Sequence, residues 1–588
     1  MDVLFEGKGK MVGWIDADEH RRWVAKNKSK ELKDKRMDAK EAVSKFIHDG
    51  DFIAIGGFGH VRVPMALVYE IIRQRKRHLA MAGKTAVHDL DLLVGAGCVD
   101  KVEVAYSFGH ELRGLSPASR RAVETGKCKV LGEISNAGYQ WRLLAGMMGV
   151  PFIPARILLG TDTLAYSSAK VVKDPFSGKP VCLLPACHPD VAMIHVPRCD
   201  KYGNAQIDGI LVEDFELARA ARRLIITTEE IISNEEIRKE PWKTVIPFYV
   251  VDAVVEVKYG SHPCQMPYLY FFDEEHIKEW LDLSKSDEGV EDYLNKYVYS
   301  VSCFEEYLDI IGKERLEYLQ RVEKLEEMSE ARKESKDYTS MELLASVASR
   351  LLEDKKSVFV GTGLPMIAAM LAQRTHAPNL LIFFEAGGIG PQIPVLPISV
   401  GDSRTFHKAI AASSMHDAMS ASQAGYIDYG FLGAAQIDKY GNINTTVIGS
   451  HDKPKVRLPG SGGANDVGSL CHKTIIIMRQ DKKRFVEKLD FLTTPGYLNG
   501  KKAREKEGLP EGSGPYRVIT QLGVYGFHEE TKEMMLLAVH PGVSIDDIKK
   551  NSGFDIIIPE KVEETAPPSP EERKILMKID PSGLIIGR

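Results

Sequence analysis

Cysteine is scarce in this sequence, with eight in 588 residues, and no two of them form a CxxC pair. Their spacing argues against a zinc ribbon or a thioredoxin-type dithiol, and scattered cysteines are typical of a reducing compartment. The N-terminus lacks a basic segment followed by an apolar one, so we predict no signal peptide. The most apolar long stretch, residues 380–400, contains Glu385, three glycines and three prolines, so it is no plain membrane helix. We therefore expect a cytoplasmic protein that does not bind membranes.

The sequence also lacks a large excess of charge. It has 77 Lys and Arg against 82 Asp and Glu, a formal net charge of −5, which argues against a nucleic-acid-binding protein. Hydrophobic residues make up 44% of the chain, as in an ordinary globular protein. The length exceeds what one hydrophobic core usually accommodates, so we expect two or more domains.

Two charged segments divide the chain. Residues 1–36 are polar and form a predicted N-terminal extension, partly helical around residues 18–32. Residues 313–337 carry leucines at helical spacing between Glu and Lys, which fits either a surface helix or an inter-domain linker. We place the domains at 37–320 and 341–588, with a charged linker at 321–340.

The two predicted domains resemble each other. The pentapeptide Asp-Lys-Tyr-Gly-Asn occurs at residues 200–204 and again at 438–442. Residues 52–59 and 358–365 each read as a strand running into a glycine turn, and a helical pattern follows both. Such alternation predicts two similar open α/β domains with mainly parallel sheets. Duplicated domains commonly hold a ligand site at their interface.

Several familiar motifs fail. A dinucleotide-binding glycine pattern is interrupted by Arg62, and a phosphate-binding loop would need glycine where His78 stands. His188, Asp190 and His195 have the spacing of no standard metal site, so we predict no metal.

Two features remain. Glu385 ends an apolar strand and precedes Ala-Gly-Gly, and a carboxylate there is costly unless it is paired or used. Its ordinary explanation would be a helix cap or a surface ion pair. Residues 460–466 are rich in glycine, so they form either a flexible turn or a loop whose N–H groups bind an anion or oxyanion. Together the two features suggest acyl chemistry with a carboxylate nucleophile.

These residues resemble those of class I CoA-transferases, above all glutaconate CoA-transferase. The first half is similar to the α subunit in residues 53–62, 119–121, 151–154, 229–232 and 259–263. The second half is similar to the β subunit in residues 361–365, 433–438, 441–442, 460–465 and 494–496. The chain thus looks like a fusion of two subunits that are separate in the typical enzyme.

The resemblance implies a ping-pong transfer of CoA from an acyl-CoA to a carboxylic acid, including dicarboxylic acids, with Glu385 as the nucleophile. It implies no cofactor, because the CoA thioester is a substrate, and it implies a homo-oligomer, a dimer or tetramer of the fused chain. The backbone N–H groups of the second-half loops are candidates for binding the oxyanion and CoA: Gly462, Gly463, Ala464, Gly361 and Gly363. Gly57 and Phe58 are candidate substrate contacts.

The sequence departs from the glutaconate pattern at residues 108–113. There, His110 or Arg113 either binds a second carboxylate or has a structural role. Hydrolases and decarboxylases on the same scaffold are the alternative function, and a non-catalytic acyl-CoA sensor is a third. Hydrolase relatives use a glutamate of the first half, for which Glu133 and Asn136 are the nearest positions.

Overall fold

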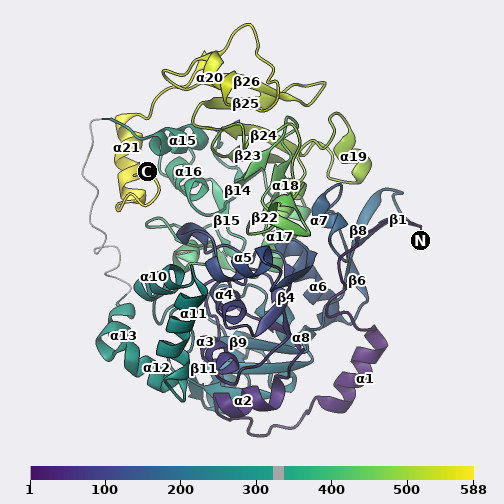
Figure 1. Cartoon of the computed structure of the whole chain (residues 1–588), viewed down its shortest axis with the longest axis vertical. Coiled ribbons are helices and arrows are strands. Elements are labelled where there is room, and N and C mark those ends of the chain that lie inside the picture. The colour runs from purple at the N-terminus through teal and green to yellow at the C-terminus, as the bar shows by residue number, and fades with distance from the viewer. Residues whose placement is uncertain (1, 322–336, 588) are drawn as a thin grey trace.

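The two halves of the chain stack along the long axis of the molecule, the first half below and the second above in the view of Figure 1. The computed structural model describes residues 2–321 and 337–587. One continuous hydrophobic core includes buried residues of both halves, such as Ile194 and Ile475. Each half is built on a mainly parallel sheet with helices, so the predicted α/β fold is confirmed.

The first-half sheet has the strand order β12-β10-β9-β2-β3-β4-β5, and β11 joins it by pairing with β9 and β13. All of its pairings are parallel except those of the short strands β10 and β12. The strands that position the site are β2 (Phe52–Ile55), β3 (Leu79–Gly83), β4 (Val99–Val104), β5 (Lys129–Glu133), β9 (Val191–Asp200) and β11 (Arg223–Ile232).

The second-half sheet has the order β17-β16-β15-β14-β18-β23-β24-β25-β26-β27. Its centre is parallel, whereas β24, β25 and β26 form antiparallel pairs at the top of Figure 1. The bounds are β14 (Ser357–Phe359), β15 (Leu381–Phe383), β18 (Tyr429–Leu432), β23 (Lys473–Ile477), β24 (Gly514–Ile519), β25 (Gly523–Phe527) and β26 (Met534–Val539).

The first strand of each sheet runs into a buried helix. Helix α3 (Met65–Arg73) follows β2, and all of its residues except Arg73 are buried. Helix α16 (Leu364–Gln373) follows β14, and eight of its ten residues are buried. Helices that are apolar on every side need cover on every side, which a sheet and neighbouring helices supply here. Both helices lie where a helical pattern was predicted to follow the glycine turns.

The repeated pentapeptide makes the same turn twice. In each copy Oδ1 of the aspartate, Asp200 or Asp438, accepts the N–H groups of the residues two and four positions later, at 2.9–3.0 Å. In each copy the asparagine amide, of Asn204 or Asn442, donates to Oδ2 of the same aspartate at 2.8 Å. The repeat therefore encodes a hydrogen-bonded turn of the duplicated frame.

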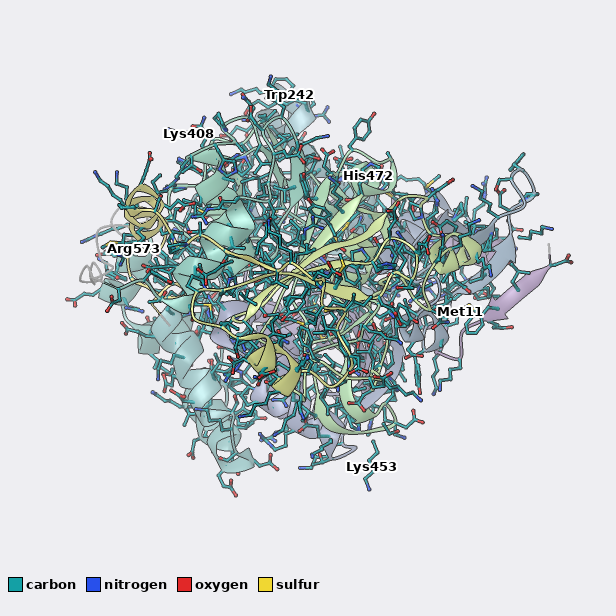
Figure 2. All side chains as sticks on the ribbon, turned by 90° about the horizontal axis from the view of Figure 1, so that it is seen from above. Met11, Trp242, Lys408, Lys453, His472 and Arg573 are labelled. Carbon is teal, nitrogen blue, oxygen red and sulfur yellow. The ribbon has the colours of Figure 1, made fainter. Side chains whose placement is uncertain are left out.

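The terminal segments lie on opposite sides of the molecule in both views, marked by Met11 and Arg573 in Figure 2. Strand β1 (Val3–Glu6) pairs with β7 (Lys170–Lys173), and helix α1 (Ala17–Asn27) overlaps the predicted helical region and ends five residues before its limit. Helix α21 (Pro570–Ile579) packs on α15 (Ser340–Ser349) and α16.

The charged stretch begins as helix α13 (Lys313–Leu319), whereas most of the predicted linker, residues 322–336, lies outside the described residues. No helix in the described ranges is both long enough and apolar enough to cross a membrane.

Candidate active site

A cavity of about 570 Å³ lies between the two halves. The first half contributes Phe58 after β2, Thr85 after β3, Tyr106 after β4 and Asn136 after β5; the second contributes residues 359–362 at the end of β14, Glu385 after β15 and residues 431–435 at the end of β18. The carboxyl ends of both parallel sheets therefore face one cavity. Open α/β sheets bind their ligands at this edge.

Glu385 projects into the cavity from the second half but is held by the first. Its side chain is 9% exposed, and Oε1 accepts a hydrogen bond of 2.6 Å from Nδ2 of Asn136. Asn136 begins helix α6 (Asn136–Met148), and its amide also contacts Oγ1 of Thr85 at 3.2 Å. Burial raises the pKa of Glu385 above its usual value, and the amide of Asn136 and the charge of Lys84 oppose that rise. The carboxylate is thus desolvated and oriented across the interface.

The glycine-rich loop lies against this carboxylate. A Cβ at position 463 would stand 2.7 Å from Oε1 of Glu385, so any residue larger than glycine would displace that carboxylate. The N–H groups of Gly462 and Ala464 already donate, to the carbonyls of Ala105 at 2.7 Å and Ser461 at 2.9 Å. The N–H of Gly463 has no acceptor among the described residues. The N–H groups of Gly462 and Ala464 are thus already engaged, whereas that of Gly463 is not, and all three stay predictions as oxyanion donors.

Of the other predicted loop and substrate residues, two line the cavity and two do not. Gly361 lines the cavity, whereas Gly363 is the residue before α16, outside the lining, and faces the side chain of Leu112. Phe58 lines the cavity. Gly57 lies outside the lining: its φ is +83°, and its N–H donates to Asp214 at 3.0 Å. Glycine is needed at position 57 for the turn and not for contact with a ligand.

His110 and Arg113, the predicted substrate contacts, do not line this cavity. Arg113 donates to the carboxylate of Glu274, with Nε at 2.8 Å from Oε2, and His110 is fully buried beside His60. Glu111, which follows His110 in the sequence, lines the cavity instead, and burial raises its pKa to about 7. Of residues 110–113 only Glu111 lines the cavity, and the sequence offered no signal for which of the four side chains would do so.

The two first-half positions weighed for a hydrolase have opposite surroundings. Glu133 is sealed in an ion pair with Nη1 of Arg457 at 2.5 Å and Nε2 of His451 at 2.8 Å. Burial alone would raise the pKa of Glu133, but Arg457 and His451 reverse this and lower it. Glu133 does not line the cavity, whereas Asn136 does. The first-half position that contacts Glu385 is therefore occupied by an amide.

Comparisons with known proteins agree with this architecture. A family model described as coenzyme A transferase matches residues 36–257 and again 341–551. Glutaconate CoA-transferase of Acidaminococcus fermentans is similar in both of its subunits. One of them is 37% identical over 42% of this chain and 96% of its own length, and the other is 34% identical over 48% and 93%. One of the subunits of 3-oxoadipate CoA-transferase from Pseudomonas knackmussii is 40% identical over 41% of this chain and 94% of its own length.

One solved structure extends over nearly the whole chain. It is an acyl-CoA transferase from E. coli O157:H7, in a thioester complex with CoA, with a TM-score of 0.66 and 17% identity over 95% of this chain and 99% of that one. At this identity the likeness supports the fold alone.

Proposed function

The chain belongs to the coenzyme A transferase family, and from that premise we propose that it moves CoA between an acyl-CoA and a carboxylic acid through a thioester on Glu385. The observation that carries the proposal is a buried carboxylate without an ion-pair partner among the described residues, set at the meeting point of two sheets. A nucleophile for an acyl group needs to be ionised and poorly solvated.

The proposed cycle has two symmetric halves. The carboxylate of Glu385 attacks the thioester carbonyl, the C–S bond breaks, and a mixed anhydride and CoA thiolate form. The thiolate then attacks the glutamyl carbonyl, so the first acid leaves as its carboxylate and Glu385 carries CoA. An incoming carboxylate repeats the steps in reverse and leaves as the new acyl-CoA. Atoms and charge balance without any cofactor.

Two donors stand where negative charge develops. The amide of Asn136 donates to the Glu385 carboxylate, and the backbone of Gly463 lies so close to it that a Cβ there would stand 2.7 Å from Oε1. An oxyanion donor placed in advance is typically worth about 10²- to 10³-fold in rate. Asn136 orients the ionised carboxylate before attack, and we propose that it follows the oxygen as the carbonyl becomes tetrahedral.

The cavity walls favour transfer over hydrolysis. Most of the lining side chains are apolar, among them Phe58, Phe359, Leu364, Val400 and Phe431. An apolar site between two halves keeps water away from an anhydride or thioester. Since Glu133 is sealed in an ion pair, the hydrolase alternative also lacks its candidate base.

The substrate class follows from the few charges that face the cavity. Arg484 is the only Lys or Arg among the lining residues in the described part of the chain. Glutaconate and 3-oxoadipate, named for the relatives, are both dicarboxylates, and one guanidinium matches their remote carboxylate. We propose a dicarboxylic acid as one substrate, with Arg484 binding the second carboxylate for which the sequence offered His110 or Arg113 as candidates.

The test is intact mass after incubation with an acyl-CoA and no acceptor acid. We expect a CoA-sized adduct that hydroxylamine removes and that Glu385→Gln lacks. Release of free acid without an adduct would favour a hydrolase, and binding without turnover would favour a sensor. For the substrate class, Arg484→Gln is expected to raise KM for dicarboxylic acceptors and to leave KM for monocarboxylic acceptors nearly unchanged.

A further inference from the structure

Three histidines from separate loops meet beneath the wall of the cavity. His60 follows β2, His88 begins helix α4 (His88–Gly95), and His110 follows β4. All three are fully buried. Each offers one ring nitrogen to a set in which all such atoms lie within 4.8 Å of one another, and Nε2 of His60 is 3.2 Å from Nδ1 of His110.

The imidazoles of this cluster are short of hydrogen-bond partners. Both ring nitrogens of His88 and Nε2 of His110 have no partner in the described part of the chain, although they are buried. Buried polar atoms in native proteins nearly always have a partner, so each such atom needs an explanation. An electron-pair acceptor between the three rings would supply a partner for the one nitrogen that His88 offers to the cluster, whereas Nε2 of His110 faces Asp91 instead.

Carboxylates stand behind two of the rings. Oδ2 of Asp91 is 3.8 Å from Nε2 of His110, and Oε2 of Glu111 is 3.4 Å from Nδ1 of His60. Asp91 is itself fixed, because its carboxylate accepts the indole N–H of Trp280 at 2.9 Å. Histidines that bind a metal through one nitrogen usually direct the other at a carboxylate, which holds the ring and its tautomer.

The charge around the cluster matches a divalent cation. Nη1 of Arg113 is 3.3 Å from Nδ1 of His60 and carries one positive charge. Asp91 and Glu111 face the rings, and Glu274 pairs with Arg113. When ionised, these three carboxylates and one guanidinium leave a net charge of −2, which a doubly charged ion would neutralise.

We propose that His60, His88 and His110 bind one divalent transition-metal ion, with Zn²⁺ the best match. Imidazole ligands suit zinc at about 2.0–2.1 Å, and tetrahedral geometry then separates ligand nitrogens by about 3.4 Å, close to the spacing of His60 and His110. The ion would tie together three segments whose neighbours Phe58, Thr85 and Glu111 line the cavity. This site revises the expectation of no metal, and it takes no part in the chemistry at Glu385.

The experiment uses the full chain produced in zinc-supplemented medium and dialysed against metal-free buffer. Elemental analysis is expected to find about one zinc per chain. After exchange, Co²⁺ is expected to give the visible ligand-field bands of a tetrahedral site. His88→Gln should lose both signals, whereas His472→Gln, a change at an exposed histidine labelled in Figure 2, should keep both.

A second variant keeps the test decisive if His88→Gln does not fold. His88→Cys retains a ligand, so the Co²⁺ form should gain a sulfur-to-cobalt charge-transfer band. The proposal is overturned if zinc-treated wild type holds less than about a tenth of an ion per chain and Co²⁺ gives no tetrahedral bands. It is equally overturned if folded His88→Gln binds as much metal as wild type.

Discussion

Corresponding strands of the two halves are followed by residues of different chemical character. The neighbours run β11-β9-β2-β3 in the first half and β23-β18-β14-β15 in the second, and every adjacent pair is parallel. By this order β3 corresponds to β15. Lys84 and Thr85 follow β3, and Glu385 occupies the same place after β15. Lys84 is consumed in a buried ion pair with Glu213, whereas Glu385 faces the cavity.

Four buried carboxylates of the first half differ from Glu385 in being paired with a cation. The first half holds several buried carboxylates, each with a cation: Glu103 with Arg142, Glu133 with Arg457, Asp214 with Arg62 and Glu213 with Lys84. Glu385 is similarly buried, yet no ion pair to it occurs within residues 2–321 and 337–587. Since a buried charge without a counter-ion is unfavourable, its retention points to use.

The largest expected effect comes from removing that carboxylate. Glu385→Gln should lower kcat by at least about 10⁴-fold, because an amide cannot form the thioester. Thr85→Ala, at the matching place in the first half, should retain activity within about tenfold, since it loses only a contact to Asn136. Steady-state transfer assays measure both. Similar losses of kcat in the two variants would show that the residues after β3 and β15 do not differ in their importance for the reaction.

Breaking a paired carboxylate should instead damage the fold. Glu133→Gln leaves Arg457 buried without its counter-charge, which typically costs about 3–5 kcal/mol of stability. Chemical denaturation is the measurement, and the folded variant should still form the CoA adduct. If Glu133→Gln has the stability of the wild type but forms no CoA adduct, then Glu133 has a chemical role. The contrast between the paired carboxylates of the first half and Glu385 would then be wrong.

Crowding the nucleophile should slow the reaction without unfolding the protein. Gly463→Ala would place a methyl group 2.7 Å from Oε1 of Glu385, and displacing the adjacent donor should lower kcat about 10²- to 10³-fold. Gly361→Ala is the control, because its Cβ would meet no atom within 4 Å. It should change KM for acyl-CoA more than kcat. Equal losses of kcat in the two variants would show that Gly463 does not stabilise the oxyanion.

The pH profile reports how the first half supports the nucleophile. Burial raises the pKa of Glu385, and attack needs the ionised form, so kcat/KM should fall with decreasing pH at values above those of an ordinary glutamate. The Asn136 hydrogen bond favours ionisation. Asn136→Ala should therefore move the acid limb to higher pH. An acid limb that stays in place would show that Asn136 does not stabilise the charge.

The sequence predicted features that depend on local pattern. Glu385 was found because an apolar strand ends at it, and α3 and α16 because their apolar runs follow glycine turns. Gly463 could not be singled out from Gly462 and Ala464, because Gly462 donates to the Ala105 carbonyl, which belongs to the other half. The histidine cluster was missed for the same reason: His188 and His195 are close in sequence, but His60, His88 and His110 meet only where parallel strands end together.

The smallest expected effect is a gain in stability. Glu385→Gln should stabilise the fold, whereas Glu133→Gln should destabilise it. The folded pKa of Glu385 is raised, so the folded state binds more protons than the unfolded chain between the two pKa values. The loss of stability caused by the ionised Glu385 carboxylate is therefore absent below the pKa of this group in the unfolded chain. It is complete above the pKa of this group in the folded protein. Glu385→Gln should raise the thermal midpoint by about 1–2 °C near neutral pH, and the gain should vanish near about pH 4. A scan at both pH values measures this, and a destabilised variant at neutral pH would mean that Glu385 is paired like the carboxylates of the first half.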